Sequence, residues 1–457
     1  MADILLATIN AKWIHPSLAL RLLRANLSEL EERSSILEFA LRQPLSDKIA
    51  GIIEAKPRIL ALSVSIWNHE ASLELLRALK EQWAGSPPLI VLGGPEASNL
   101  APDAELLAEC DYLVCGEGEH AFRELCRALL RGEKGGDGGT GYTRIEAGLV
   151  DPASIESAYR LYTDEDLHRK LTYVEASRGC PFGCEFCLSF LDRKVRDFDL
   201  DRFLNEMDGL IQRGARSFKF LDRTFNLDLQ RSRAIMEFFL SRAQDGLYVH
   251  FEMVPSRFPL ELRETLKKFT AGSLRLEVGI QTFNPEVAAT IGRPSNPERE
   301  LEAIRFLTEQ TNAIVHADLI AGLPGESFSS FAEGFDRLWK ARPSEIQLGV
   351  LKRLPGTPLC RHDAPYGMKY ATEPPYEVIS TKDLSEAELN TLKNFARFWE
   401  LIVNRGHFEE LVVSLLPKGS GAFVRFLALS NALLEHFGKN WGIDRAELRA
   451  FLREEAL

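Results

Sequence analysis

The stretch Ser177-Arg178-Gly179-Cys180-Pro181-Phe182-Gly183-Cys184-Glu185-Phe186-Cys187 holds three cysteines in the spacing C-x3-C-x2-C. Cysteine thiolates are the usual protein ligands of iron–sulfur clusters, and a cubane cluster contains four irons. Three closely spaced thiolates can hold three of these irons and leave the fourth without a protein ligand. Such an open iron is a place where a small molecule can bind and react. The stretch therefore predicts a catalytic [4Fe-4S] cluster whose metal ligands are Cys180, Cys184 and Cys187.

A structural zinc site, or a chance gathering of cysteines, is the alternative interpretation. A structural zinc ion usually takes four ligands from Cys and His. The nearest histidines, His168 and His250, do not stand at a zinc-finger spacing from the cysteines. Gly179, Pro181 and Gly183 instead favour a tight loop wrapped around a bulky group.

The residues around and after the cysteines alternate between short apolar runs and helical patterns. Strands are expected at Thr172–Ser177, Ser217–Leu221, Val249–Met253, Leu274–Ile280, Ile314–Ile320 and Glu345–Leu351. Helices are expected between them at Leu200–Arg213, Leu229–Arg242, Leu260–Phe269, Pro297–Gln310 and Phe328–Lys340. This repeat predicts a partial (β/α)6 barrel over residues 171–365. Because barrel enzymes place their chemistry at the carboxyl ends of the strands, the cysteine loop after the first strand puts the cluster at that end.

The first 131 residues show a second alternation of the same kind. Strands are expected at Asp3–Ile9, Ile36–Leu41, Arg58–Ser65, Leu89–Gly93 and Asp111–Cys115. Helices are expected near Ser17–Glu31, Asp47–Glu54, His69–Trp83, Asp103–Glu109 and Glu119–Arg131. The strand runs are apolar throughout, as in parallel strands buried on both faces. The pattern predicts an α/β domain with a doubly wound parallel sheet.

Ligands of such a sheet bind beyond the carboxyl ends of its strands. Small or acidic residues stand at or just after the ends of the third, fourth and fifth expected strands, namely Ser63, Ser65, Gly93, Gly94, Gly116 and Glu117. Glycines at these positions let a ligand approach the backbone closely. The first strand is not followed by G-x-G-x-x-G, and no G-x4-G-K-[ST] motif is present, so a dinucleotide or P-loop site is not indicated.

Two further segments complete the chain. Residues 132–170 are interpreted as a linker, because Gly132-Glu133-Lys134-Gly135-Gly136-Asp137-Gly138-Gly139-Thr140-Gly141 is too glycine-rich for a helix. Residues 366–457 predict a small helical domain, with helical periodicity over Ser385–Asn404, Ala422–His436 and Arg445–Glu454. Its aromatic residues are interpreted as ordinary core.

An N-terminal α/β domain followed by a C-x3-C-x2-C barrel resembles the cobalamin-binding radical S-adenosylmethionine (radical SAM) family. Three stretches resemble loop signatures of that family: His15-Pro16-Ser17-Leu18-Ala19-Leu20, Leu92-Gly93-Gly94-Pro95-Glu96 and Val114-Cys115-Gly116-Glu117-Gly118-Glu119. The resemblance implies three cofactors: the [4Fe-4S] cluster, SAM on its open iron, and cobalamin in the first domain. The D-x-H-x-x-G motif, which supplies a histidine to cobalt in other cobalamin proteins, is absent.

The resemblance also implies which residues contact SAM. Strand-end and turn positions of the barrel match the family's SAM-binding segments, and one aromatic residue between two cysteines would pack on adenine. These residues are Asp222, Glu277, Gln281, Gly322 and Phe186. The family often has a second acidic residue after the position of Asp222, where this chain has Arg223.

For cobalamin, the loop Ile66-Trp67-Asn68-His69 matches the segment that the family places near the lower face of the corrin. Trp67 or Asn68 is therefore expected near that face. A purely structural role, with Trp67 in the core and His69 starting a helix, is the alternative.

The implied function is reductive cleavage of SAM to a 5′-deoxyadenosyl radical, which leads to methylation of an unactivated carbon of a substrate that the sequence does not identify. One alternative is radical rearrangement or cyclisation without methyl transfer. Another is a cobalamin-binding or redox-sensing protein without SAM turnover. A methylthiotransferase would need a second cluster, and Cys110, Cys115 and Cys126 have the wrong spacing for one.

The composition of the chain narrows the range of expected binding partners. The chain has 55 Lys and Arg against 66 Asp and Glu, a net charge of -11, which argues against a nucleic-acid partner. Seven cysteines are an odd number and suggest free thiols in a reducing cytoplasm. The first residues do not resemble a signal peptide, and apolar runs stay below the ~18 residues of a membrane span. We expect a cytoplasmic protein that binds SAM, a small-molecule or peptide substrate, and a reducing partner such as a flavodoxin or ferredoxin.

Overall fold

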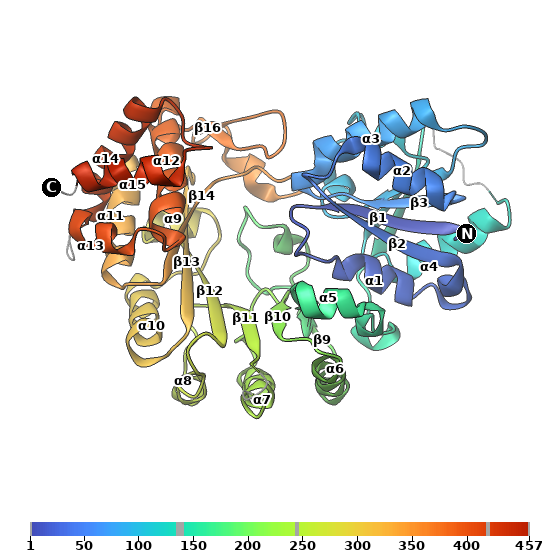
Figure 1. Ribbon diagram of the computed structural model, residues 1–457, viewed down its shortest axis with the longest axis horizontal. Helices are drawn as coiled ribbons and strands as arrows, with labels where there is room; N and C mark the ends of the chain where they lie inside the picture. The colour runs from blue at the N-terminus through green and yellow to red at the C-terminus, as the bar shows by residue number, and fades with distance from the viewer. Residues whose placement is uncertain (1, 134–140, 243–245, 417–420, 456–457) are drawn as a thin grey trace.

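The computed structural model describes residues 2–133, 141–242, 246–416 and 421–455. Two sheets with their helices lie side by side, and a third, helical part packs at the end of the second sheet that is far from the first (Figure 1). Most of the predicted glycine-rich connection, residues 134–140, lies outside the described residues. Within the described ranges, no helix combines the length and apolar character that crossing a bilayer would require.

The first sheet is parallel throughout, with the strand order β2-β1-β3-β4-β5-β6. Its strands are β1 (Ile4–Asn10), β2 (Ser34–Ala40), β3 (Ile59–Ser63), β4 (Leu89–Gly93), β5 (Tyr112–Gly116) and β6 (Thr143–Gly148). Helices α2 (Leu45–Ala55) and α3 (His69–Gln82) pack on one face, and α1 (Leu18–Ala25) and α4 (Glu119–Leu130) pack on the other. The predicted doubly wound sheet is confirmed, and β6 is an additional strand from the segment interpreted as a linker.

The second sheet is also parallel, with the linear order β7-β10-β11-β12-β13-β14, so its two end strands are not paired and the barrel stays open. Its strands are β7 (Thr172–Val174), β10 (Ser217–Phe220), β11 (Tyr248–Met253), β12 (Leu274–Gln281), β13 (Ile314–Ala321) and β14 (Glu345–Val350). The helices that follow them are α6 (Leu200–Gln212), α7 (Leu229–Leu240), α8 (Leu260–Leu266), α10 (Pro297–Gln310) and α11 (Phe328–Lys340). Shorter elements are α5 (Asp164–Arg169), β8 (Ser177–Arg178), β9 (Arg196–Asp197) and α9 (Pro285–Thr290).

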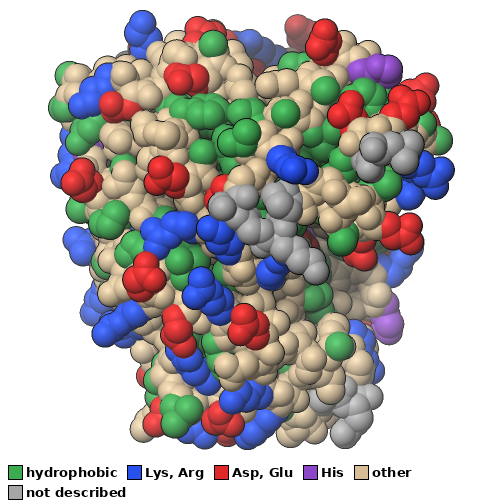
Figure 2. All heavy atoms as spheres, turned by 90° about the vertical axis from the view of Figure 1, so that its left-hand side faces the viewer, with side chains coloured by type: hydrophobic (Ala, Val, Ile, Leu, Met, Phe, Trp, Pro, Cys, Tyr) green, Lys and Arg blue, Asp and Glu red, His purple; other side chains and the backbone are tan. Residues whose placement is uncertain are grey.

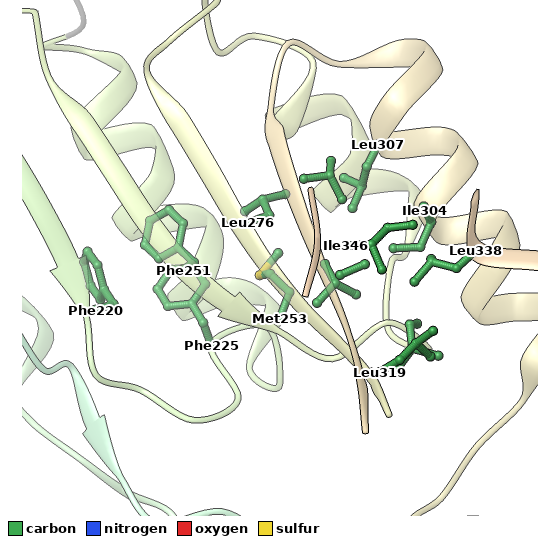
Figure 3. Packing of buried hydrophobic residues seen from close by; sticks show 14 of the residues in the cluster. Phe220, Phe225, Phe251, Met253, Leu276, Ile304, Leu307, Leu319, Leu338 and Ile346 are labelled. Atoms are coloured by element: carbon green, nitrogen blue, oxygen red, sulfur yellow. The ribbon is translucent and has the colours of Figure 1, made fainter. Parts of the chain in front are cut away.

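The two faces of this sheet differ in polarity. Along β12, Leu274, Leu276, Val278 and Ile280 are buried, whereas the alternate residues are only partly buried. The apolar face packs against the helices, where Phe220 and Phe251 lie on one side of Leu276 and residues of α10 and α11 lie on the other (Figure 3). The opposite face, which lines the open barrel, is polar.

The C-terminal part consists of α12 (Glu386–Trp399), a π-helical turn (Glu400–Asn404), α13 (Glu409–Leu415), α14 (Ala422–Phe437) and α15 (Arg445–Glu455), preceded by the hairpin of β15 (Lys369–Tyr370) and β16 (Val378–Ser380). Phe335 of α11 packs edge-to-face on Phe395, Trp399 and Phe423, with centroid distances of 5.2, 4.8 and 5.7 Å. These helices therefore share one core with the barrel. Figure 2 shows the outer side of these helices in the upper half of the view, where charged side chains of both signs surround areas of hydrophobic side chains.

Candidate active site

The cysteine loop is closed by the antiparallel pair β8 and β9, in which Arg178 lies opposite Arg196. The backbone N–H of Cys180 donates to the carbonyl of Asp192 at 2.9 Å, and that of Cys187 donates to the carbonyl of Cys184 at 3.1 Å. Gly179 has a φ of +87° and packs against the backbone of Lys194, so a side chain would not fit there. The loop is therefore a compact turn at the carboxyl end of the first barrel strand.

All three cysteines line one cavity of about 280 Å³. Burial raises the pKa of Cys180 and of Cys184 above the ordinary thiol value, so their thiolate forms need a compensating positive charge, which iron would supply. In the described part of the chain, no three His, Cys, Asp or Glu side chains gather closely enough to hold one metal ion.

The same cavity brings together three of the residues predicted to contact SAM: Phe186, Glu277 and Gln281. Gln281 has a positive φ of 72° at the bulge between β12 and β13, an unusual backbone state for a residue other than glycine. Such states are often found at functional sites. Here the bulge brings the end of β12 to the cavity wall.

Charged residues that the sequence did not single out complete the lining, notably Glu252, Arg293 and Asp318. His250 Nε2 lies 3.1 Å from Glu277 Oε2, and this contact, with Lys219 nearby, lowers the pKa of Glu277 to about 2. Burial raises the pKa of Glu252 and of Asp318. Among these residues, Glu277 is a firmly ionised carboxylate, whereas a cationic ligand would stabilise the charge of Glu252 and of Asp318.

Asp222 and Gly322 occupy other places. Asp222 is buried, and its carboxylate accepts the N–H of Ala176 at 2.9 Å and the hydroxyl of Ser177 at 2.6 Å. It therefore braces the entry to the cysteine loop. Gly322 has a φ of +85° and packs tightly against Val378 of the C-terminal hairpin. Neither residue belongs to the lining of the cavity, and their predicted contacts with SAM stay predictions.

The burial of Asp222 gives a first testable prediction. Burial raises its pKa from 3.8 to about 6 despite the two hydrogen bonds that the carboxylate accepts. A carboxyl group with a higher pKa in the folded state binds its proton more tightly there, so its contribution to stability falls as the pH rises through this window. The total fall is about 3 kcal/mol, of which about 1 kcal/mol lies between pH 5 and pH 7.

Asp222→Asn should remove this part of the pH dependence, because the amide does not titrate. Urea unfolding of the parent and the variant at pH 5 and pH 7 measures it, since other titrating groups are common to both proteins. Two stability curves that run parallel over this range would contradict the assignment.

The carboxyl edge of the first sheet carries the residues predicted for cobalamin. Trp67 is 53% exposed, and Ile14, in the loop after the neighbouring strand β1, is 40% exposed. Asn68 is fully buried: its amide oxygen accepts the N–H of Ser65 at 2.8 Å, and its amide nitrogen donates to the carbonyl of Ile9 at 2.9 Å. Asn68 thus stabilises the turn that presents Trp67, while the exposed apolar side chains offer a surface for a flat macrocycle.

The remaining predicted positions lie at the carboxyl ends of β3, β4 and β5. Ser63 ends β3 beside Gly94, whose φ of +97° and contact with the backbone of Val64 exclude a side chain. Gly93 ends β4, and Gly116, with a φ of +91°, ends β5 against Gly148. These glycines are explained by packing within the domain, and their contacts with cobalamin stay predictions.

Glu117 joins the first domain to the cysteine loop. Its carboxylate oxygens lie 2.7 and 2.8 Å from the guanidinium of Arg196 and 3.5 Å from that of Arg178. The pKa of Glu117 is lowered because these cations and the N–H of Val150 outweigh the effect of burial. A second link is the hydrogen bond of 2.9 Å between Tyr173 of β7 and His15 in the loop after β1.

Comparison with protein families divides the chain in the same order. Residues 4–126 match the family described as B12 binding domain, and residues 174–338 match the Radical SAM superfamily. Residues 364–441 match a family described as a protein of unknown function, DUF4080. The chain belongs to the cobalamin-binding radical SAM family.

Curated relatives and solved structures of this family are similar over long stretches. A 2-(S-pantetheinyl)-carbapenam-3-carboxylate methyltransferase of Streptantibioticus cattleyicolor is 28% identical over 389 residues, 74% of this chain and 54% of the relative. The cobalamin-dependent S-adenosylmethionine radical enzyme OxsB has a TM-score of 0.68 and 16% identity, over 99% of this chain and 75% of OxsB. The radical SAM methyltransferase TsrM of Kitasatospora setae has a TM-score of 0.65 and 17% identity, over 99% of both chains.

The two solved structures support the fold of the family. This chain spans about half the length of the first curated relatives that it matches.

Proposed function

We propose that the protein is a cobalamin-dependent radical SAM enzyme that methylates an unactivated carbon of its substrate. The observation that carries the proposal is the shared cavity: Cys180, Cys184 and Cys187 line it together with Glu277 and Gln281, next to a B12-binding domain. The bound groups would supply the difficult chemistry, namely reductive cleavage of SAM to a 5′-deoxyadenosyl radical and delivery of a methyl group.

The three cysteines would hold the cluster, and the cavity beside them would hold SAM. SAM carries positive charge on its sulfonium and its ammonium, which suits the carboxylates of Glu252, Glu277 and Asp318. Phe186, between two of the cysteines, offers an aromatic face for adenine. The chain thus contributes a charged and shaped cavity that orients the ligand and limits access of water.

Cobalamin would lie at the carboxyl edge of the first sheet, against Trp67 and the glycine-bearing turns. Glu117 with Arg178 and Arg196, and His15 with Tyr173, hold this edge close to the barrel. These contacts support a mechanism in which one substrate meets groups bound to both domains.

Formation of 5′-deoxyadenosine tests the proposal. The full chain is purified without oxygen, reconstituted with iron, sulfide and hydroxocobalamin, and supplied with SAM and dithionite. We expect a cubane absorbance and 5′-deoxyadenosine, detected by mass spectrometry. Protein that binds zinc with no cubane absorbance, or a reconstituted cluster that does not cleave SAM, would overturn the proposal.

The fate of the methyl group separates methylation from rearrangement or cyclisation. With SAM that carries a trideuterated methyl group and a small-molecule extract of the native host, methyl transfer puts the label into a product. In a rearrangement the label remains in methionine. We expect the former, because a curated relative that matches this chain over 389 residues is described as a methyltransferase.

The proposal includes a reducing environment and an electron donor. All seven cysteines are free, three of them at the predicted cluster site. Free thiols and an iron–sulfur cluster both suit a reducing compartment such as the cytoplasm. A one-electron donor such as a flavodoxin or ferredoxin would replace dithionite there.

A further inference from the structure

Glu185 is a buried carboxylate inside the cysteine loop itself. It directly follows Cys184, and it is only 3% exposed. A carboxylate removed from water is costly unless opposite charges or hydrogen-bond donors compensate it. The three cysteines would hold the cluster without this side chain, so its burial calls for another explanation.

The partners of Glu185 come from the far end of the barrel. They lie in the short 3-10 helix Pro358–His362 that follows β14. His362 Nε2 lies 2.7 Å from Glu185 Oε2, and the guanidinium of Arg361 pairs with Glu185 Oε1. His362 is buried, whereas the side chain of Arg361 is 61% exposed. Two potential cations therefore meet one carboxylate that is more than 170 residues away along the chain.

The backbone of the loop is fixed at the same point. The N–H of Glu185 donates to the carbonyl of Ile291 at 3.0 Å. Gly292 has a φ of +64°, and a Cβ at this position would collide with the carbonyl of Gly183 and lie 3.2 Å from Glu185 Oε1. The connection after β12, the cysteine loop and the segment after β14 thus meet at Glu185. A shift of the segment after β14 would move the loop between Cys184 and Cys187.

The charges near the cysteine loop matter for a bound cluster as much as the position of the loop does. Cysteine ligands bind metals as thiolates, so a cluster at this loop places negative charge next to the carboxylate of Glu185. Hydrogen bonds and net charge around a cluster set its reduction potential. A negative neighbour opposes uptake of an electron, and a positive neighbour favours it.

We propose that Glu185, Arg361 and His362 form a clamp that positions the cysteine loop and sets the reduction potential of the cluster. The inference rests on the proposed function, since it assumes a cluster on the three cysteines. These three are positioning residues: Glu185 acts on the cluster through the loop and through its charge, and Arg361 and His362 act through Glu185.

A potentiometric titration of the reconstituted full chain, followed by electron paramagnetic resonance, tests the clamp. Glu185→Gln removes a negative charge, and we expect the ratio of reduced to oxidised cluster at a fixed potential to rise about tenfold, a positive shift of about 59 mV for one electron. Arg361→Gln leaves the carboxylate less compensated and should shift the ratio in the opposite direction. Iron per chain after desalting is measured in parallel, and we expect both variants to retain less iron than the parent.

Asp363→Asn is the matched control. It removes the ion pair of 2.6 Å between Asp363 and Arg353, which lies in the same segment but does not involve the cysteine loop. We expect the parent's potential and iron content. Because Arg361 is largely exposed, its variant tests the clamp even if Glu185→Gln does not fold.

Unchanged potentials and iron contents in both clamp variants would overturn the inference, and so would shifts in the same direction for both. In either case a parent protein with an intact cluster leaves the proposed function standing. A parent protein that binds no cluster would overturn both.

Discussion

Cys184→Ala is expected to abolish formation of 5′-deoxyadenosine and to prevent stable assembly of the cluster. Cys184 is the middle one of the three cysteines, is 9% exposed, and lines the cavity with the other two. Its Sγ also lies 3.8 Å from Nη1 of Arg293, a cation that would stabilise a thiolate. With two thiolates left, two irons of the cube would have no protein ligand. Iron and sulfide per chain, the cubane absorbance and the deoxyadenosine yield measure the loss.

Cys126→Ala is the matched control for this experiment. Cys126 is a fully buried thiol of α4 in the first domain, and burial raises its pKa to about 12, as expected of a structural cysteine. Its replacement removes a thiol of similar burial but should leave iron content and SAM cleavage at the level of the parent. Equal deoxyadenosine yields from Cys184→Ala and the parent would contradict the cluster assignment.

The cysteine site could be predicted from sequence because its chemistry is local. Three ligands within one loop need no knowledge of the rest of the fold. The same holds for the buried parallel strands of the first sheet, which their apolar runs indicated. By contrast, β6 alternates between exposed and partly buried residues and contains Arg144 and Glu146. Its pairing with β5 depends on tertiary structure, and the sequence of a polar edge strand does not indicate such pairing.

The first predicted helix is shorter than expected for a local reason. The predicted helix Ser17–Glu31 stops at Ala25, where the side chain of Asn26 donates to the carbonyl of Leu22 and competes with the helix backbone. A 3-10 helix, Ser28–Arg33, follows. The predicted helix Asp103–Glu109 is reduced to a 3-10 turn, Leu107–Glu109.

Contacts between segments that are distant along the chain could not be predicted from the sequence. Tyr376 of the C-terminal part donates to Glu96 of the first domain at 2.6 Å, and Glu96 also binds His69 at 2.9 Å. These residues are separated by up to 307 positions, and no local pattern links them. For the same reason the bracing role of Asp222 and the packing of Gly322 on Val378 became visible only in the structure, although the family resemblance had drawn attention to both.

Arg178→Met is expected to destabilise the protein by about 3–5 kcal/mol, because it leaves buried carboxylates without their cation. Arg178 is 10% exposed and lies 2.7 Å from both Glu175 and Glu119, and 3.5 Å from Glu117. Burial would lower the pKa of Arg178, but these carboxylates outweigh it and raise the pKa. Methionine keeps much of the volume and removes the charge, so the loss is mainly electrostatic.

The loss should depend on pH in a defined direction. Burial already raises the pKa of Glu175, and removal of Arg178 would raise it further. Protonation then relieves part of the penalty, so the variant should be closer to the parent at pH 5 than at pH 8. Urea unfolding of the cofactor-free protein at both values measures this difference.

Arg127→Met is the comparison that separates a buried ion pair from an exposed one. Arg127 of α4 binds Glu29 at 2.6 Å, but the two side chains are 28% and 59% exposed. Its loss should change the unfolding midpoint little, because water and salt screen the attraction between exposed charges. Arg178 differs from Arg127 in a second respect, because Glu117 and Glu119 belong to the first domain and Arg178 belongs to the cysteine loop. Equal unfolding midpoints for the two variants would show that this contact does not hold the cobalamin-binding domain against the cluster site.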